Sequence, residues 1–297
     1  MTTKNNPLAC MRFARSSSRR LLPGLLLALG LGGCVEVIGI EDTEIEPGRD
    51  LACLGRVVPP PVVAGATVEI RAQIVDIGGS GEVPGVEVVR CNSRLGAACD
   101  FATPFAPDAT GLVVVPVTAG FNGYLRILDA DASDDAEGKD WVPYLWYFSQ
   151  PINQTREEPF PIQAMTTGVR EFLVYPETTV TQDPQYGDVA INAVDCNDNN
   201  APNIHFEVTT PASEGPNTAP FYFGGGMVVI ASALENEVTD ETGLGGFRAL
   251  EPGTMIVRAW VADTFNPEPG HAGSTLVAED TLLIEADTLT TVRLLPE

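Results

Sequence analysis

Short runs in which apolar and polar residues alternate constrain this chain more than any other feature. Residues 67–75 are one such run, in which apolar side chains would face a core and polar ones solvent. Turn-forming residues separate the runs, and the 297 residues include 29 glycines and 24 prolines. The pattern predicts an all-β fold of short strands and tight turns. Further strands are expected at residues 51–60, 86–91, 112–117, 124–128, 141–148, 187–196, 204–208, 246–250, 254–260, 275–284 and 289–295.

The order of strands and turns repeats along the chain. A turn of the form Asp-x-Thr-Gly follows the second strand in each half, at Asp108–Gly111 and again at Asp240–Gly243. An internal repeat of this length indicates a duplicated structural unit. We therefore expect two tandem β-sandwich domains, at residues 51–150 and 187–297, with a connector at 151–186.

The connector contains the only segment with helical spacing. Between Pro161 and Tyr175, apolar residues including Met165, Val169 and Phe172 fall near one face of a helix. We expect at most one short helix here, and a strand is the alternative.

Four segments carry a resemblance to a known family. They are Pro84-Gly85-Val86-Glu87-Val88, Asp108-Ala109-Thr110-Gly111-Leu112, Thr239-Asp240-Glu241-Thr242-Gly243 and Glu251-Pro252-Gly253-Thr254. With these segments the sequence resembles the carboxypeptidase regulatory-like domain, a small transthyretin-like β-sandwich related in architecture to immunoglobulin-like domains. The resemblance implies that glycines allow the turns and that alternating residues fill the core. It brings no catalytic residues, so we expect no enzyme activity.

The N-terminal segment has the layout of a secretory signal peptide. A basic stretch from Arg12 to Arg20 precedes a leucine-rich run that ends in Leu31-Gly32-Gly33-Cys34. That ending resembles the lipobox of bacterial lipoproteins, which implies cleavage before Cys34 and attachment of lipid to its thiol. Residues 1–33 would be removed, and translation could start at Met1 or Met11. Residues 34–50 are expected to form an acidic tether.

Charge and hydropathy limit the partners of the mature protein. The net charge is −23, and the signal peptide contains five basic residues and no acidic one. A chain of this charge repels nucleic acid and anionic lipid headgroups. No other apolar stretch approaches the roughly 18 residues of a membrane span, so attachment to the membrane is expected through the lipid alone. Val35 stands where an aspartate can retain lipoproteins in the inner membrane. Its presence favours the outer membrane of the cell envelope.

Four cysteines remain beyond Cys34, namely Cys53, Cys91, Cys99 and Cys196. An even number in an oxidising compartment predicts two disulfides, with three possible pairings. Cys91 and Cys99 flank a short loop, so we favour that pair, and Cys53 then pairs with Cys196. A zinc site is disfavoured because there is no CxxC spacing and only two histidines.

A few residues could support chemistry. Asp195, Asn197 and Asn199 place oxygen atoms at alternate positions, as at the start of a calcium loop. The glycine expected at the sixth position is missing, and Asp and Asn are also good turn formers, so the sequence favours a turn and no cofactor. His205 is expected to point outward from a strand, and His271 to lie in a loop.

The aromatic residues Trp141, Tyr144 and Trp146 are the strongest candidates for ligand contact. Exposed rings there would bind carbohydrate or protein, whereas buried rings would simply pack a core. The sequence therefore predicts a non-enzymatic, lipid-anchored envelope protein with a structural or ligand-presenting role. The alternative is a surface adhesin that uses exposed aromatics in residues 141–148 to bind a protein or glycan.

Overall fold

The computed structural model describes residues 50–54, 61–77, 85–96, 98–130, 141–175, 182–209, 218–224, 228–229, 238–261 and 275–296. All of them belong to one compact unit, Gly48–Glu297. The expected signal peptide, the lipidated Cys34, all of the tether but Asp50, and His271 lie outside the described residues.

The first half of the described chain forms two groups of three strands. In one, β1 (Thr67–Asp76) pairs antiparallel with β3 (Leu112–Thr118) and parallel with β6 (Phe160–Ala164). In the other, β4 (Tyr124–Asp129) pairs antiparallel with both β2 (Val86–Cys91) and β5 (Tyr144–Tyr147).

The second half repeats this arrangement with six strands of its own. β7 (Gly187–Ala193) pairs antiparallel with β11 (Leu244–Leu250) and parallel with β14 (Leu289–Leu294). β12 (Gly253–Val261) pairs antiparallel with both β8 (Ile204–Thr209) and β13 (Thr275–Ile284). The strands β1, β2, β3, β4, β5 and β6 thus correspond in pairing to β7, β8, β11, β12, β13 and β14.

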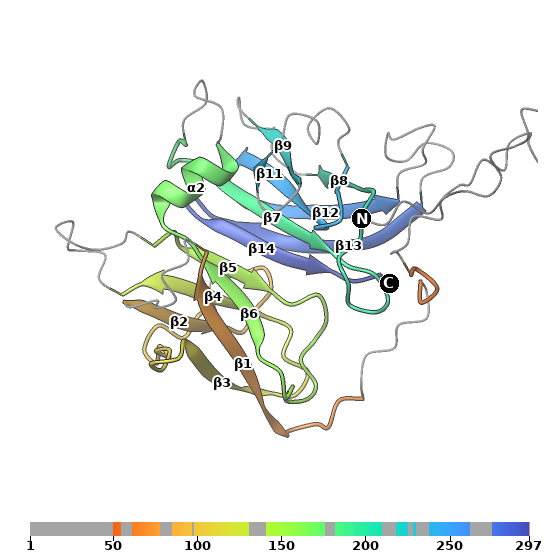
Figure 1. Ribbon diagram of the computed structural model, residues 1–297. Coiled ribbons are helices and arrows are strands. Elements are labelled where there is room, and N and C mark those ends of the chain that lie inside the picture. Colours follow the sequence, from red (N-terminus) through yellow and green to blue (C-terminus); the bar gives the residue numbers. More distant parts are fainter. Residues whose placement is uncertain are drawn as a thin grey trace, which may run out of the picture. The chain divides into compact units, whose positions relative to one another are not determined.

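One sheet runs through both halves. β14 pairs parallel with β5 as well as with β7, so the order of the eight-stranded sheet is β10-β9-β11-β7-β14-β5-β4-β2. Its two outer strands in the second half are β9 (Ala219–Gly224) and β10 (Val228–Val229). Figure 1 shows β1, β3 and β6 as a separate layer below β14 and β7. The all-β class is confirmed, and the expected domain limits remain a prediction.

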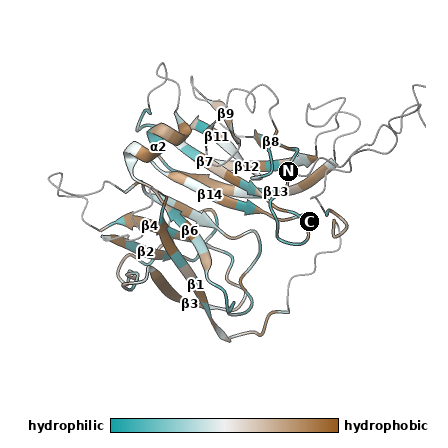
Figure 2. Cartoon of the chain, viewed as in Figure 1, coloured by the Kyte–Doolittle hydropathy of each residue, from teal (hydrophilic) through white to brown (hydrophobic). Residues whose placement is uncertain are grey.

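Two hydrophobic cores lie on opposite faces of the eight-stranded sheet. The first core lies between this sheet and β1, β3 and β6, and the second between this sheet and β8, β12 and β13. Along β14, Leu289 packs into the first core, whereas Val292 and Leu294 pack into the second. On β5, Tyr144 faces the first core and Leu145 the second. Apolar and polar residues accordingly alternate along the strands in Figure 2. Each core follows from the period of two in a strand.

The two Asp-x-Thr-Gly turns have the same geometry. Oδ1 of Asp108 accepts hydrogen bonds from the backbone N–H and hydroxyl of Thr110, and Asp240 does the same for Thr242. Gly111 and Gly243 close these turns with φ of 82° and 65°. A Cβ on either glycine would overlap a backbone carbonyl oxygen of the neighbouring strand β1 or β7. The turns therefore need both the aspartate and the glycine.

The expected connector contains a strand and a helix in succession. β6 joins the sheet of β1, and α2 (Thr167–Val174) follows directly, with Thr166 as its N-cap. The helix is shorter than the apolar spacing indicated. The expectation that Phe172 faces the core was wrong, because its side chain is 68% exposed. Leu173 and Arg170 are buried in its place.

Two other local expectations also need correction. Leu51–Leu54 form a turn, not the start of a strand, because the segment runs toward Cys196 and pairs with no sheet. The strand expected at 141–148 is limited to Tyr144–Tyr147. Trp141 makes only an isolated bridge to Thr166.

Candidate functional site

A groove lies beside the outer edge of β6. Its floor is the part of the eight-stranded sheet that β6 leaves uncovered, on the same face as the first core. Its volume is about 490 Å³, within the range of ligand pockets. One wall is β6 with the segment before it, and the floor is formed by β7 and β14. Both strands present alternate side chains to it. The floor residues are Ala190 and Asn192 on β7 and Leu289, Thr291 and Arg293 on β14.

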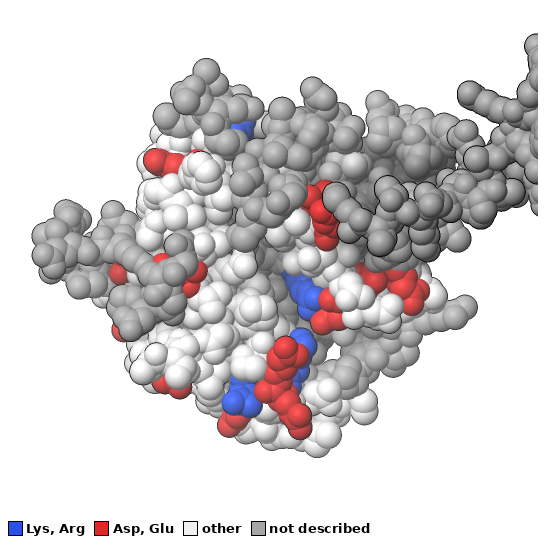
Figure 3. Space-filling view, in the orientation of Figure 1, with Lys and Arg blue, Asp and Glu red and all other residues white. Residues whose placement is uncertain are grey.

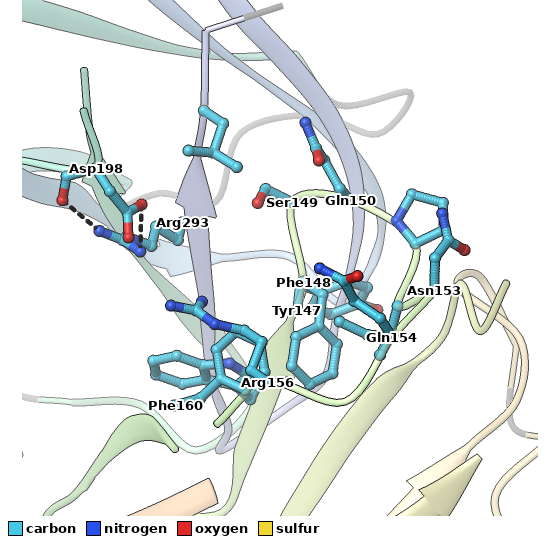
Figure 4. A pocket seen from close by; sticks show the side chains of 14 residues that line it. Tyr147, Phe148, Ser149, Gln150, Asn153, Gln154, Arg156, Phe160, Asp198 and Arg293 are labelled. Atoms are coloured by element: carbon cyan, nitrogen blue, oxygen red, sulfur yellow. Dashed lines mark hydrogen bonds and ion pairs between the residues drawn. The ribbon is translucent and has the colours of Figure 1, made fainter. Parts of the chain in front are cut away.

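Aromatic rings line the groove at its junction with the first half. Trp146 is the only one of the three predicted aromatic contacts that keeps a partly exposed side chain, and Phe160 lies across from it on β6. A smaller pocket of about 170 Å³ continues from this point and shares both rings. Figure 4 shows the smaller pocket, with Phe160 beneath the guanidinium group of Arg156.

Two arginines line both pockets. Arg293 forms an ion pair with Asp198 at 2.7 Å and also donates to the backbone carbonyl of Asp198 at 2.8 Å. Arg156 is exposed, and its guanidinium carbon lies 4.6 Å from the centroid of Phe160. In the space-filling view, basic side chains lie next to acidic ones on the face shown (Figure 3). The groove also contains Glu158.

Two buried polar atoms belong to residues that line the groove. Tyr144 Oη and Asn192 Oδ1 have no hydrogen-bond partner among the described residues. Burial raises the pKa of Tyr144 well above its usual value, so the hydroxyl keeps its proton. Most buried polar atoms in native proteins are hydrogen-bonded. These two atoms are therefore compatible with a polar group bound nearby.

Trp141 and Tyr144 are not available for the role that the sequence suggested. Trp141 is 5% and Tyr144 1% exposed, and both pack in the first core. Of the three rings, only that of Trp146 is partly exposed. Tyr144 lies on the face of β5 that packs into the first core, and Trp141 precedes β5 and packs into the same core.

Asp195 organises a turn. Oδ1 accepts the backbone N–H groups of Asn197 and Asn199 at 2.8 and 3.0 Å, and Oδ2 accepts that of Asp50. Burial alone would raise the pKa of Asp195, but these N–H donors outweigh it and lower the pKa. The carboxylate that would begin a calcium loop is thus committed to backbone donors. In the described part of the chain, no cluster of three or more His, Cys, Asp or Glu side chains is arranged to hold a metal.

A buried ion pair lies beside the groove. Arg170 on α2 is 1% exposed and pairs with Asp188 on β7, which is 0% exposed, at 2.8 Å. Asp188 also accepts hydrogen bonds from the hydroxyl of Tyr175 and the backbone N–H of Ala249. The carboxylate of Asp188 thus contacts Arg170, Tyr175 and the backbone of Ala249, all within the fold. Its role is to hold α2 against the second half.

The structure contains two disulfides, Cys53–Cys196 and Cys91–Cys99, the pairing that the sequence favoured. The short loop of the second disulfide carries Arg94, which pairs with Asp280 on β13. The first disulfide holds the segment around Cys53 to the end of β7. The first disulfide therefore joins distant parts of the chain directly, and the second closes the loop from which Arg94 reaches β13.

His205 is buried, contrary to the expectation that it points to solvent. It is 8% exposed and lies in register with Trp260 on β12. The alternation within one strand could not indicate this burial, which depends on packing from outside the strand.

Sequence reasoning missed Arg156, Phe160 and Arg293 as possible site residues. The alternation in residues 289–294 places Thr291 and Arg293 on one face of a strand, which is a usable signal. Their closeness to Trp146 depends on the parallel pairing of β14 with β5. No local pattern encodes that pairing.

Comparisons with known proteins identify no family. No family model matches the chain. No curated protein matches it either. Among solved structures, the TIE protein of Bacillus anthracis has 13% identity over 78% of this chain and 34% of its own, with a TM-score of 0.22. The chain thus spans about a third of that protein.

Two further solved structures are pilins. A streptococcal ancillary pilin has 14% identity over 78% of this chain and 69% of its own, with a TM-score of 0.22. The shaft pilin SpaA from Lactobacillus rhamnosus GG has 8% identity over 78% and 98%, also with a TM-score of 0.22. Likenesses at this level carry no argument about what this chain does.

Within the described residues, no helix has the length and apolar character needed to cross a membrane.

Proposed function

We propose that this chain is a non-enzymatic, lipid-anchored protein of the bacterial cell envelope, with a structural or ligand-presenting role. The observation that carries the proposal is the eight-stranded sheet, which joins both halves through β5 and β14. Two sandwiches that share one sheet form a stiff body. Such a body suits a protein that holds a surface at a fixed distance from a membrane.

The chemistry of the buried charged groups supports the non-enzymatic role. Asp188 and Arg170 neutralise each other, and Asp195 binds backbone donors of a turn. Two disulfides support an oxidising compartment outside the cytoplasm. The carboxypeptidase regulatory-like resemblance belongs to this proposal as well, since it implies sandwich domains without catalytic residues.

Labelling of Cys34 with a fatty acid tests the lipid attachment, and separation of the membranes tests the outer-membrane location. The full-length chain would be produced in a Gram-negative host that is fed a labelled fatty acid. We expect label in the membrane fraction and an intact mass that corresponds to cleavage before Cys34 plus acyl chains. Separation of inner and outer membranes would locate the product.

Two variants make the test specific. Cys34→Ser should remove the label and release the protein from the membrane. Cys10→Ser, a matched change within the segment that is removed, should alter neither. Label that persists in Cys34→Ser would refute the anchor.

The second candidate function is that of an adhesin for protein or glycan, and one observation favours it. Trp146 is partly exposed in a groove of about 490 Å³. Burial of Trp141 and Tyr144 restricts any such contact to this groove.

A further inference from the structure

Among the described residues, no strand lies beside the edge of β6 that faces away from β1, whereas the corresponding strand of the second half has a neighbour there. Within the same residues, β6 pairs with β1 alone and is an end strand of its sheet. Its counterpart β14 pairs parallel with β7 and parallel with β5. The duplicated fold therefore contains one example of a parallel strand added at this position. No described strand of the first half occupies this position.

The open position coincides with the groove. Strands in a sheet lie about 4.8 Å apart and stacked sheets about 10 Å apart. A strand beside β6 would thus extend the layer of β1, β3 and β6 across β7 and β14, whose floor side chains there include Ala190 and Thr291. Side chains this short leave room for an added strand. On β6, Pro161 and Gln163 border the groove with exposed side chains.

The side chains around this position suit a peptide with an acidic residue. Arg156 is exposed, rests on Phe160 and forms no ion pair with a described residue. Among the lining residues, Arg293 is neutralised by Asp198, which leaves Arg156 as the cation that can take a carboxylate. Glu158 also lines the groove but forms no ion pair with Arg156. Trp146, Phe160 and Leu244 offer apolar surface for the residues next to it.

We propose that the groove binds an extended peptide that adds a strand parallel to β6 and places an acidic side chain against Arg156. Hydrogen bonds to the carbonyl groups of Pro161 and Gln163 and to the N–H of Gln163 would give affinity, because Pro161 has no N–H to donate at this edge. Alternate apolar side chains would contact the floor. The buried and unpartnered Asn192 Oδ1 supports a polar occupant on the floor. This inference goes beyond the structural role proposed above. It does not depend on lipid attachment, so either can fail without the other.

The test uses fluorescent peptides and the full-length protein in detergent. Four ten-residue peptides alternate valine with threonine. One carries glutamate at a central position, and one carries lysine there. The other two carry glutamate with N-methyl groups on alternate residues, one in each register. Fluorescence anisotropy measures binding.

We expect saturable binding of the glutamate peptide and at least tenfold weaker binding of the lysine peptide. The N-methyl peptide of one register should bind at least tenfold more weakly than the glutamate peptide, because its methyl groups remove two or more backbone hydrogen bonds of about 1 kcal/mol each. Equal binding of both N-methyl registers, or no saturable binding of the glutamate peptide, would overturn the proposal.

Two pairs of variants locate the site. Arg156→Glu should reverse the preference between the glutamate and lysine peptides, whereas Arg258→Glu, an equal change of charge on β12, should not. Ala190→Trp should block the floor and weaken binding at least tenfold. Val114→Trp, on the exposed face of β3, should leave it unchanged. Melting temperatures identify any variant that fails to fold. Arg156 is exposed, so Arg156→Glu should fold and keeps the test decisive if Ala190→Trp does not.

An acidic oligosaccharide, oligogalacturonate, serves as the competing probe. The proposal predicts that it does not displace the glutamate peptide. The opposite result has three parts: oligogalacturonate binds the protein, it binds the Arg156→Glu variant more weakly, and the peptides do not bind. In that case the groove is a glycan site and the peptide proposal is wrong.

Discussion

At the scale of single residues, the pair formed by Arg170 and Asp188 carries the largest expected effect. Both are almost fully buried, so Arg170→Met would leave the Asp188 carboxylate without its charged partner. A buried pair broken in this way costs about 3–5 kcal/mol of unfolding free energy. The exposed pair of Arg258 and Glu279 is the control, since Arg258→Met should cost about 1 kcal/mol or less. Urea unfolding measures both, and equal losses would contradict the structural role of Asp188.

Asp195 gives a prediction about pH. Its pKa is lowered in the folded protein, since the N–H donors outweigh burial, relative to about 3.9 in an unfolded chain. A lowered pKa means that the carboxylate stabilises the fold above the unfolded value. That contribution disappears as the pH falls through the folded pKa. Asp195→Asn should therefore lose less stability than the wild type between pH 7 and pH 3 in urea unfolding. Identical losses would show that the turn does not depend on the ionised carboxylate.

At the scale of elements, the Asp-x-Thr-Gly turns allow a matched comparison of glycines. Gly111, Gly243 and Gly65 all have positive φ, but only the first two lack space for a Cβ. Gly65→Ala should cost about 1–2 kcal/mol from backbone strain alone. Gly111→Ala and Gly243→Ala should exceed this by about 1–3 kcal/mol, because the added carbon displaces a strand. Thermal unfolding of the three variants ranks them, and an equal cost would remove the packing argument.

The same turns show what the sequence could predict. Alternation located β1, β2, β3 and β4 and their counterparts because a half-buried strand must alternate, and the repeated turns indicated the duplication. β6 was harder, because five residues that include Pro161 carry little pattern. The apolar spacing that continues through Phe172 favoured a longer helix. The groove was predicted only through Trp146, since Arg156 and Arg293 meet it by a pairing of strands far apart in the chain.

At the scale of the whole molecule, the disulfides differ in the length of chain that they close. Cys53 and Cys196 are separated by 143 residues, and Cys91 and Cys99 by 8. In the chain-entropy model, the first contributes about 5 kcal/mol and the second about 2.5 kcal/mol. Replacing Cys53 and Cys196 together with serine should therefore lower the urea midpoint more than replacing Cys91 and Cys99. The reverse order would mean that the short loop, with Arg94 in it, contributes more than chain entropy.

Polar contacts reinforce the shared sheet across the two halves. Tyr147 on β5 donates a hydrogen bond to the carbonyl of Arg94 at 2.9 Å and accepts one from the N–H of Leu283 on β13 at 3.1 Å. Arg126 on β4 pairs with Glu285 at 2.8 Å. These contacts flank the junction of β5 and β14 on the face of the second core. They favour unfolding of both halves as one unit.

Hydrogen exchange resolved to single residues tests the central claim, that β5 and β14 join the halves in one sheet. The amides in Leu289–Val292 that bond to β5 should exchange as slowly as those of β7 in the interior of the second half, because opening the junction would require opening the shared sheet. Fast exchange at these amides, with slow exchange in β1 and β7, would contradict it. The halves would then be separate sandwiches in loose contact.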